Sequence, residues 1–460
     1  MKIEQIYTGC LAQGAYFITS NGEAAVIDPL REVAPYIEKA KKLNVKIKYV
    51  FETHFHADFV SGHVDLAEKT GAKIVYGPKA ETGFESYIAS DGEVFKLGDI
   101  TLKVLHTPGH TMESSCYLLA DQNGKETALF SGDTLFIGDV GRPDLAQNGD
   151  ITQDDLAGIL FDSLRSKIMS LPDDIIVYPA HGAGSACGKS MSKETSDSLG
   201  NQKRFNYALR ADMTREEFIK EVTSGLTEPP QYFPENVKMN RDGYESIDDV
   251  LERGDHALSA ELFEAKANTT NALILDTRKA DDFARGFIPN SINIGIDGGF
   301  APWVGALIPD LKQNILLVTE PGREEEVVTR LARVGYDHAI GYLKGGFKIW
   351  EKAGKEIDTV TSLPADDFAK RYKAGDVKII DVRKPDEFES GHVDGAQNFA
   401  LDTINDDMSE LPKSETLYVH CAGGYRSMIA ASILKSRGFD DVVNIEGGFG
   451  AIKKTDVTLN

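Results

Sequence analysis

Cysteine and basic residues are scarce in this sequence. Cysteine accounts for 4 of 460 residues, too few for a fold held together by disulfides. The 50 Lys and Arg residues are outnumbered by 72 Asp and Glu residues, which leaves a net charge of −22. Because such a chain repels phosphate backbones and anionic lipids, we expect neither nucleic acid nor a membrane among its partners.

Long apolar runs are also missing. No segment approaches the roughly 20 apolar residues of a membrane-spanning helix. The first residues include Lys2, Glu4 and Gln5 and lack the apolar centre of a signal peptide. We therefore expect a cytoplasmic protein with reduced cysteines. Hydrophobic residues still make up 41% of the chain, and its length predicts about three domains.

The second half of the chain contains an internal repeat. Residues 274–293 and 379–398 match without gaps at an offset of 105, and a Gly-Gly-Phe motif at 345–347 returns at 447–449. Each copy alternates strand and helix patterns over about 100 residues, so the repeat predicts two small parallel α/β domains.

A proline-rich stretch separates the repeat from the first part of the chain. Pro229, Pro230 and Pro234 follow a helix that Thr214 and Glu217 predict through a capping box. The predicted domains cover residues 1–240, 241–357 and 358–460.

Histidine and aspartate follow the ends of several predicted strands in the first domain. Because the carboxyl ends of strands converge on the ligand site of open α/β folds, these side chains should cluster. Imidazole and carboxylate donors bind iron or zinc. The side chains are His54, His56 and Asp58 after the strand at 46–52, and His110, Asp133 and His181 after the strands at 101–105, 127–130 and 175–178.

The donor types alone leave the metal open. Two imidazoles and one carboxylate on one face form the ligand set of non-haem Fe(II) oxygenases. Zinc could instead be held by His54, His56 and His110 together with a water molecule.

The motif at 53–58, followed by the later His, Asp and His, resembles the metallo-β-lactamase superfamily. This resemblance implies an α/β fold of the αββα sandwich type. Family members with two metals carry a further His where this chain has Phe59. Phenylalanine has no donor atom, so a second metal would lack a ligand.

Two further segments, 138–144 and 178–185, resemble the persulfide dioxygenase branch of that superfamily. The resemblance implies one Fe(II) per chain, held by His54, His110 and Asp133. The remaining candidates would orient these ligands or handle protons; they are His56, Asp58 and His181. Zinc is the alternative metal.

Cys187 follows His181 closely in a Gly-rich loop. It is a candidate accessory thiol for sulfur relay, although a small buried residue is the interpretation we favour.

A cysteine-containing loop follows the strand predicted at 417–420. A thiol at the start of a helix has a lowered pKa, because the helix dipole and backbone N–H groups stabilise the thiolate. Two glycines allow the loop to form an anion nest, and an arginine adds a cation. The predicted persulfide-binding loop comprises Ala422, Gly423, Gly424, Tyr425, Arg426 and Ser427 after the nucleophile Cys421.

This loop resembles that of rhodaneses, in which its length is associated with sulfur transfer. The resemblance implies that Cys421, assisted by Arg426, accepts a sulfane sulfur and passes it to a nucleophile. In the middle copy Glu320 takes the place of Cys421, and no cysteine occurs between Cys187 and Cys421. We therefore expect the middle copy to be an inactive rhodanese-like domain.

Over its full length the chain resembles a persulfide dioxygenase fused to two rhodanese-like domains, the first lacking the cysteine. The implied partners are a low-molecular-weight thiol persulfide, O2 and sulfite. The dioxygenase would produce sulfite and a thiol, and Cys421 would form thiosulfate, in sulfide detoxification. Arg142, Lys203 and Arg204 are candidates for binding an anionic thiol. The middle domain would offer a surface for homo-oligomers.

Two alternatives stay open. The first is a zinc thioester hydrolase of glyoxalase II type fused to a sulfurtransferase, which would work without O2. The second is a sulfur-carrier protein with a vestigial metal site, in which Cys421 delivers sulfur to a partner.

Overall fold

The computed structural model describes residues 1–147, 150–375 and 377–460. The chain forms two compact units, one comprising Met1–Ile247 with Ala332–Gly335 and the other Asp248–Leu331 with Tyr336–Asn460. No helix in the described parts of the chain is both long enough and apolar enough to span a membrane. All four cysteines are free thiols.

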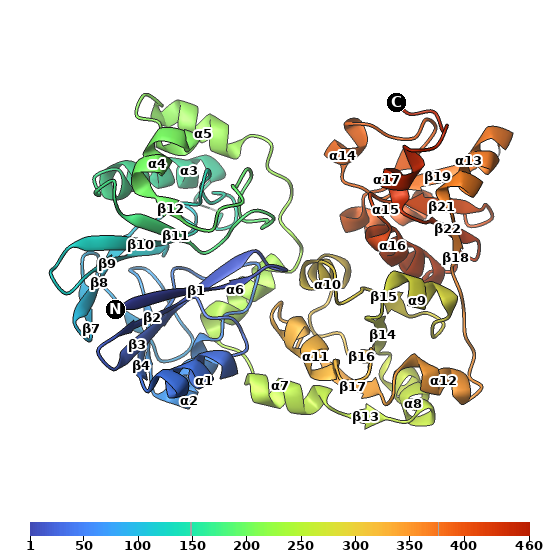
Figure 1. Ribbon diagram of the computed structural model, residues 1–460, viewed down its shortest axis with the longest axis horizontal. Coiled ribbons are helices and arrows are strands. Elements are labelled where there is room, and N and C mark those ends of the chain that lie inside the picture. Colours follow the sequence, from blue (N-terminus) through green and yellow to red (C-terminus); the bar gives the residue numbers. More distant parts are fainter. Residues whose placement is uncertain (148–149, 376) are drawn as a thin grey trace. The chain divides into compact units, whose positions relative to one another are not determined.

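The first unit contains two six-stranded sheets (Figure 1). The first sheet has the order β1-β2-β3-β4-β5-β6 and comprises β1 (Lys2–Thr8), β2 (Gln13–Ser20), β3 (Glu23–Ile27), β4 (Lys46–Phe51), β5 (Lys73–Tyr76) and β6 (Tyr87–Ile88). The second has the order β12-β11-β10-β9-β8-β7 and comprises β7 (Val94–Leu97), β8 (Ile100–His106), β9 (Ser115–Ala120), β10 (Glu126–Gly132), β11 (Ile176–Pro179) and β12 (Asp197–Ser198).

Apolar side chains fill the space between these sheets. Phe51 from the first sheet packs with Val104, Tyr117 and Phe130 from the second in one buried cluster. Helices cover the outer faces. The first sheet carries α1 (Ala34–Leu43) and α2 (His63–Thr70), and the second carries α3 (Gln153–Ser163), a π-helical turn (Leu164–Ile168), α4 (Leu199–Phe205), a 3-10 turn (Tyr207–Leu209) and α5 (Arg215–Thr223). The predicted αββα sandwich is confirmed.

The end of the first unit includes α6 (Phe233–Asp242). The predicted domain boundary after residue 240 falls inside this helix, and the first unit continues to Ile247. The boundary after residue 357 falls between α12 (Phe347–Lys352) and β18 (Thr361–Leu363). The exact domain limits stay predictions.

The second unit contains two parallel five-stranded sheets with the same strand order, as the repeat predicts. The middle copy comprises α7 (Ile247–Gly254), β13 (Ala257–Leu258), α8 (Ala260–Thr270), β14 (Leu273–Asp276), α9 (Ala280–Arg285), β15 (Ile292–Asn293), α10 (Phe300–Leu307), β16 (Ile315–Val318), α11 (Glu324–Ala332), β17 (Ala339–Leu343) and α12. The C-terminal copy comprises β18, α13 (Ala365–Ala374), β19 (Lys378–Asp381), α14 (Pro385–Glu389), β20 (Gln397–Asn398), a 3-10 turn (Leu401–Thr403), α15 (Ile404–Asp407), a 3-10 turn (Met408–Glu410), β21 (Leu417–His420), α16 (Tyr425–Ser436), β22 (Val442–Ile445) and α17 (Gly448–Ile452).

The residues shared by the two copies make the same contacts in each. Arg278 bonds the carboxylate of Asp276, at 2.5 Å, and the carbonyl oxygen of Gly286. Its counterpart, Arg383, bonds Asp381, at 2.6 Å, and Gly391. The repeat therefore encodes one local structure twice.

The sheet register corrects one predicted equivalence. Asp276 pairs with Val318, and its counterpart Asp381 pairs with His420. The residue after each central strand is therefore Thr319 in the middle copy and Cys421 in the C-terminal copy. The expectation that Glu320 replaces Cys421 is wrong by one position.

Candidate metal centre and sulfur-carrying loop

Three side chains at strand ends of the first unit meet at one point. His54 follows β4, His110 follows β8 and Asp133 follows β10. One donor atom from each lies within 4.8 Å of the others, and all three are buried. Asp133 Oδ2 lies 3.7 Å from His54 Nε2 and 3.5 Å from His110 Nε2. These donors fit a metal ion.

The other ring nitrogen of each histidine is already held. His110 Nδ1 lies 2.8 Å from the carbonyl oxygen of Arg142, so it donates its proton there. His54 Nδ1 lies 3.0 Å from Thr53 Oγ1. Hydrogen bonds at Nδ1 fix the ring orientation of metal-binding histidines and leave Nε2 free as the donor. Both rings are therefore prepared to bind through Nε2.

The pKa shifts agree with metal-binding protonation states. Burial, followed by the charges of His56 and His110, lowers the pKa of His54 well below its usual range. Burial raises the pKa of Asp133, but the charges of His181 and His54 outweigh it and hold that pKa below its usual range. A neutral imidazole and an ionised carboxylate are the forms that bind metals.

His181 and Asp58 stand behind the carboxylate of Asp133. His181 Nδ1 lies 2.8 Å from Asp133 Oδ1, and its Nε2 lies 2.9 Å from Asp58 Oδ2. Burial lowers the pKa of His181, but the two carboxylates outweigh it and raise that pKa well above its usual range. The protonated ring thus links two carboxylates and leaves Asp133 Oδ2 turned toward His54 and His110.

His56 points to a different acid. Its Nε2 lies 3.1 Å from Asp28 Oδ1, and the ring of Phe59 packs against it with centroids 4.4 Å apart. Even so, donor atoms of His56, Asp58 and His181 also lie within 4.8 Å of one another. Phe59 itself offers no donor atom, so the expectation that a second metal would lack a ligand stays a prediction.

The cysteine loop of the C-terminal copy forms as predicted between β21 and α16. Cys421 is buried, and its Sγ accepts the N–H of Gly424 at 3.1 Å and lies 3.6 Å from Ser427 Oγ. Arg426 turns to Glu387, with Nη1 2.6 Å from Oε2 and Nη2 2.9 Å from Oε1. The backbone part of the predicted cradle is present, while Arg426 is held in an ion pair.

Comparison with known proteins agrees with this architecture. Residues 8–181 match the family model of the metallo-beta-lactamase superfamily, and residues 259–353 and 364–455 match that of the rhodanese-like domain. A crystal structure titled as a metallo-beta-lactamase from Staphylococcus aureus subsp. aureus COL is 32% identical, with a TM-score of 0.66, covering 75% of this chain and 99% of that one.

The chain belongs to the metallo-β-lactamase superfamily. It carries rhodanese-like domains after its metallo-β-lactamase fold.

Two further relatives match part of the chain. The probable hydroxyacylglutathione hydrolase glo2 of Schizosaccharomyces pombe is 36% identical over 172 residues. The match covers 36% of this chain and 62% of that relative. The crystal structure of ETHE1 from Myxococcus xanthus is 28% identical, with a TM-score of 0.45, covering 53% of this chain and 99% of that chain.

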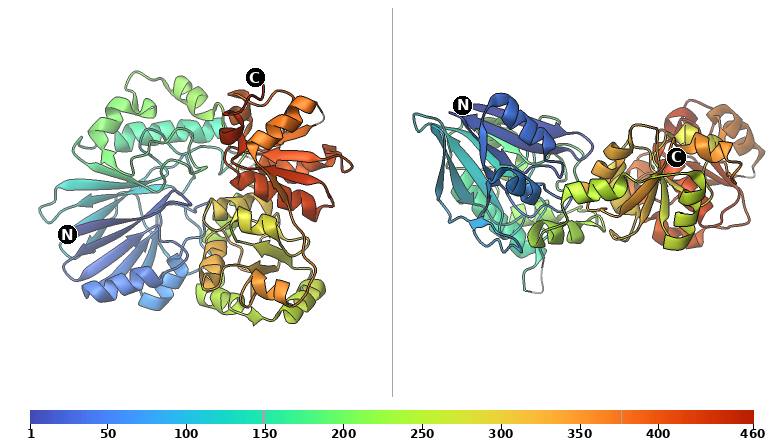
Figure 2. Two further views of the ribbon diagram at one scale, coloured as in Figure 1. Left: turned by 45° about the vertical axis from the view of Figure 1, so that its right-hand side comes forward. Right: turned by 90° about the horizontal axis from the view of Figure 1, so that it is seen from below.

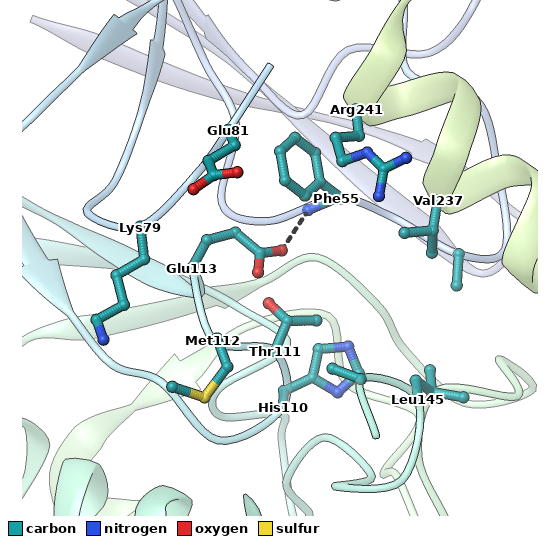
Figure 3. Close-up of a pocket in the computed structure, with 12 residues that line it drawn as sticks. Phe55, Lys79, Glu81, His110, Thr111, Met112, Glu113, Leu145, Val237 and Arg241 are labelled. Atoms are coloured by element: carbon teal, nitrogen blue, oxygen red, sulfur yellow. Dashed lines mark hydrogen bonds between the residues drawn. The ribbon is translucent and has the colours of Figure 1, made fainter. Parts of the chain in front are cut away.

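A cavity of about 280 Å³ opens beside the candidate metal centre (Figure 3). Its lining includes His110, Met112 and Glu113, with Lys79 and Arg241 as the cations. The basic residues expected to bind an anionic thiol do not line it. Arg142 is buried and bonds Asp144, Lys203 pairs with Asp173, and Arg204 bonds Asn201.

Cys187 lies beside the same centre. Its sulfur is within 4.8 Å of donor atoms of Asp133 and His181. Burial, followed by the charges of Asp58 and Asp133, raises the pKa of this thiol well above its usual range. Cys187 is thus a protonated, buried thiol next to the metal centre, and a role in sulfur relay stays a prediction.

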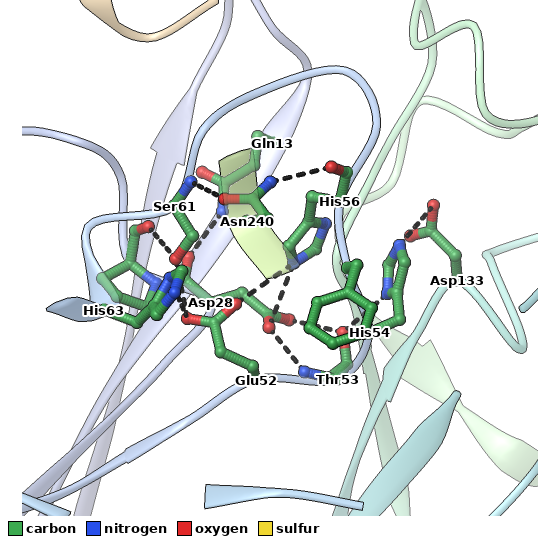
Figure 4. Close-up of polar contacts among 12 residues, drawn as sticks. Gln13, Asp28, Glu52, Thr53, His54, His56, Ser61, His63, Asp133 and Asn240 are labelled. Atoms are coloured by element: carbon green, nitrogen blue, oxygen red, sulfur yellow. Dashed lines mark hydrogen bonds and ion pairs between the residues drawn. The ribbon is translucent and has the colours of Figure 1, made fainter. Parts of the chain in front are cut away.

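Sequence analysis missed the residues that fix the backbone and side chains of the histidine motif by hydrogen bonds (Figure 4). Asp28 accepts the N–H and the hydroxyl of Thr53, at 2.8 and 2.9 Å. Asn240 donates to the carbonyl oxygens of His56 and Phe59, both at 2.8 Å. Asp28 follows β3 directly, so the strand-end rule could have found it. Asn240 lies on α6 and carries no comparable signal.

Proposed function

We propose that the metallo-β-lactamase domain is a mononuclear Fe(II) dioxygenase for low-molecular-weight thiol persulfides, and that Cys421 uses a second persulfide to form thiosulfate. The observation that carries this proposal is the donor set of His54, His110 and Asp133. Two Nε2 atoms and one Oδ2 atom face a common point. Non-haem Fe(II) oxygenases use two histidines and one carboxylate in this way, with coordination positions left open.

The bound iron would supply open positions and the capacity for one-electron chemistry with O2. In the overall reaction one persulfide, one O2 and one water give the thiol, sulfite and two protons. Sulfur gives up four electrons, and O2 takes them. His181 lies between Asp133 and Asp58 and holds the Asp133 carboxylate in place, and the cavity at His110 receives the substrate.

The second reaction takes place at Cys421. Its thiolate attacks the outer sulfur of a persulfide, forms a new S–S bond and expels the thiolate of the carrier. Sulfite then attacks the outer sulfur on Cys421, which releases thiosulfate and restores the thiolate after proton transfer. The N–H of Gly424, 3.1 Å from Sγ, supports the anionic sulfur in each step.

The Cys421→Ser variant tests the coupling of the two reactions. We expect it to consume O2 at the normal rate and to release sulfite instead of thiosulfate. Cys10→Ser, which changes a half-buried thiol elsewhere, is the matched control and should keep the thiosulfate yield. An unchanged thiosulfate yield in Cys421→Ser would overturn the coupling.

A zinc thioester hydrolase of glyoxalase II type is the second candidate. The names of curated relatives favour it, as does the second donor set of His56, Asp58 and His181, which suits a two-metal site. This candidate predicts hydrolysis of a glutathione thioester by zinc-loaded protein without O2. The iron proposal predicts no such turnover.

A further inference from the structure

The middle copy touches the sulfur-carrying loop of the C-terminal copy. Within the second unit, the hydroxyl of Tyr425 donates to the carbonyl oxygen of Gly295 at 2.7 Å. The N–H of Asn293 donates to Ser432 Oγ on α16 at 2.9 Å. Figure 2 shows these two copies side by side, the middle copy running from yellow-green to light orange and the C-terminal copy from orange to red. The thiol-less copy is thus bonded to the helix that begins at the cysteine loop.

We propose that the middle copy positions the Cys421 loop, with Tyr425 as the positioning residue and the segment Gly295–Gly298 as its support. The inference rests on the proposed sulfur transfer at Cys421. The middle copy, which has no cysteine, would thereby influence the reactivity of Cys421 in the C-terminal copy.

Tyr425 is connected to the sulfur of Cys421 through a single residue, Gly424. Gly424 donates its N–H to Cys421 Sγ and has a φ of +110°, in the region that favours glycine. Tyr425 is the next residue and the first of α16. Because the Tyr425 hydroxyl is bonded to Gly295, the first residue of α16 is held in place, and it positions the adjoining Gly424, whose N–H bonds the sulfur. Burial raises the pKa of Tyr425, so its hydroxyl stays protonated and able to donate.

The middle copy leaves space for this ring by having glycine at one position. A Cβ atom at Gly298 would lie 2.3 Å from Tyr425 Cζ, a distance that forces the ring to move. At the neighbouring Gly299, a Cβ atom would lie 3.4 Å from the side chain of Trp303, which is ordinary contact. The two glycines therefore form a matched pair of substitution sites.

A cavity of about 640 Å³ lies where the two copies meet at the loop. Through this cavity a sulfur donor or acceptor can reach the loop by passing along the middle copy. The lining residues include Gly423, Gly424 and Asn444 on one side and Ala280, Ala284 and Arg285 from α9 on the other.

The test compares Tyr425→Phe, Gly298→Ala and Gly299→Ala in the full chain. The readout is the pH profile of alkylation of Cys421 by iodoacetamide, followed by mass spectrometry of the peptide. The charged pair nearby, Arg426 and Glu387, is the same in all variants. We expect Tyr425→Phe and Gly298→Ala to change the profile and to slow alkylation at neutral pH by about threefold, because the N–H of Gly424 is no longer held against the sulfur. Gly299→Ala should match the wild type.

Profiles of Tyr425→Phe and Gly298→Ala that match that of Gly299→Ala would overturn the proposal. If Gly298→Ala does not fold, Tyr425→Phe decides, because it removes only the hydroxyl. Alkylation needs no turnover, so this result is separate from the proposed function. Absence of thiosulfate formation by the wild type would contradict the function and leave the positioning of the loop intact.

Discussion

Asp28 illustrates how single buried residues prepare the metal centre. Its φ of +48° is in the left-handed region, which is unusual for a residue other than glycine. In that conformation its carboxylate reaches both Thr53, which bonds His54, and Nε2 of His56. One carboxylate thereby orients two histidines of the motif without being a candidate ligand for the first metal.

We expect Asp28→Asn to weaken metal retention. The amide nitrogen cannot accept the hydroxyl proton of Thr53, so His54 loses its fixed orientation, and losses of this kind cost about 10- to 100-fold in affinity. Competition with a chelator, followed by metal analysis, measures the effect. Asp154→Asn, at an exposed position on α3, is the control. Equal retention by both variants would show that Asp28 does not orient the ligands.

Glu387 provides a prediction on pH dependence. The hydrogen bond from Arg426 lowers the pKa of Glu387 from 4.5 to about 2, although burial opposes the shift. A lowered carboxyl pKa adds stability above the unfolded value of 4.5, and this stability is lost as the pH falls through about 2. Because the side chain is 38% exposed, its contribution is under about 1 kcal/mol.

We therefore expect Glu387→Gln to be less stable than the wild type at neutral pH and nearly equal to it in acid. Urea denaturation at several pH values measures the difference in unfolding free energy. Glu389→Gln, an exposed neighbour, should follow the wild type throughout. A difference between Glu387→Gln and the wild type that does not change with pH would contradict the assignment.

At the residue scale, the sequence predicted which side chains belong to a site better than it predicted which residues those side chains bond. His54, His110 and Asp133 could be predicted to cluster because each follows a strand, and the ends of those strands meet. The pairing of Arg426 with Glu387 could not, because Glu387 lies 39 residues away in the sequence and only the packing of α14 brings it to Arg426. Arg142 was expected at a ligand pocket, yet its bonds to Asp144 hold it in the interior.

At the scale of elements, the start of α17 supports the cysteine loop. A Cβ atom at Gly448 would lie 2.3 Å from the carbonyl oxygen of Cys421, and the φ of Gly448 is +54°. In the middle copy a Cβ atom at Gly346 would lie 2.8 Å from the carbonyl oxygen of Thr319. The same close approach in both copies agrees with the register that aligns Thr319 with Cys421.

We expect Gly448→Ala to destabilise the C-terminal domain by about 2 kcal/mol or more, because it combines backbone strain with a collision against a carbonyl group. Gly423→Ala is the control within the loop itself, since a Cβ atom there has nothing within 4 Å. The stability of both variants is measured by denaturation, with the reaction of Cys421 with a thiol reagent as the signal of unfolding. Similar stability of the two variants would argue against the close approach.

Strands and helices with clear local signals could be predicted from the sequence, whereas registers could not. The capping box of Thr214 and Glu217 forms at the start of α5. The strand expected at 46–52 is β4, Lys46–Phe51. The loop after β16, residues 319–323, is one residue longer than the loop after β21, residues 421–424, so comparison of the two sequences displaced the equivalence of Thr319 by one residue. Hydrogen bonding between strands, which depends on the neighbouring strand, resolves it.

At the scale of the whole molecule, the proposed function links two sites on one chain. The metallo-β-lactamase domain would release sulfite, and the C-terminal domain would consume it at Cys421. Covalent linkage of the two sites raises the effective concentration of sulfite at the second site without any new contact. The internal repeat and the strand-end motifs allowed this organisation to be predicted, while the metal depends on donor geometry and on measurement.

The most direct test of this account is O2 uptake by protein purified anaerobically, analysed for metal and then given glutathione persulfide or coenzyme A persulfide. The account predicts bound iron, rapid uptake with at least one of these persulfides, one O2 consumed for each thiosulfate formed, and no uptake by the zinc-loaded form. Bound zinc with no O2 uptake, together with hydrolysis of a glutathione thioester, would contradict it.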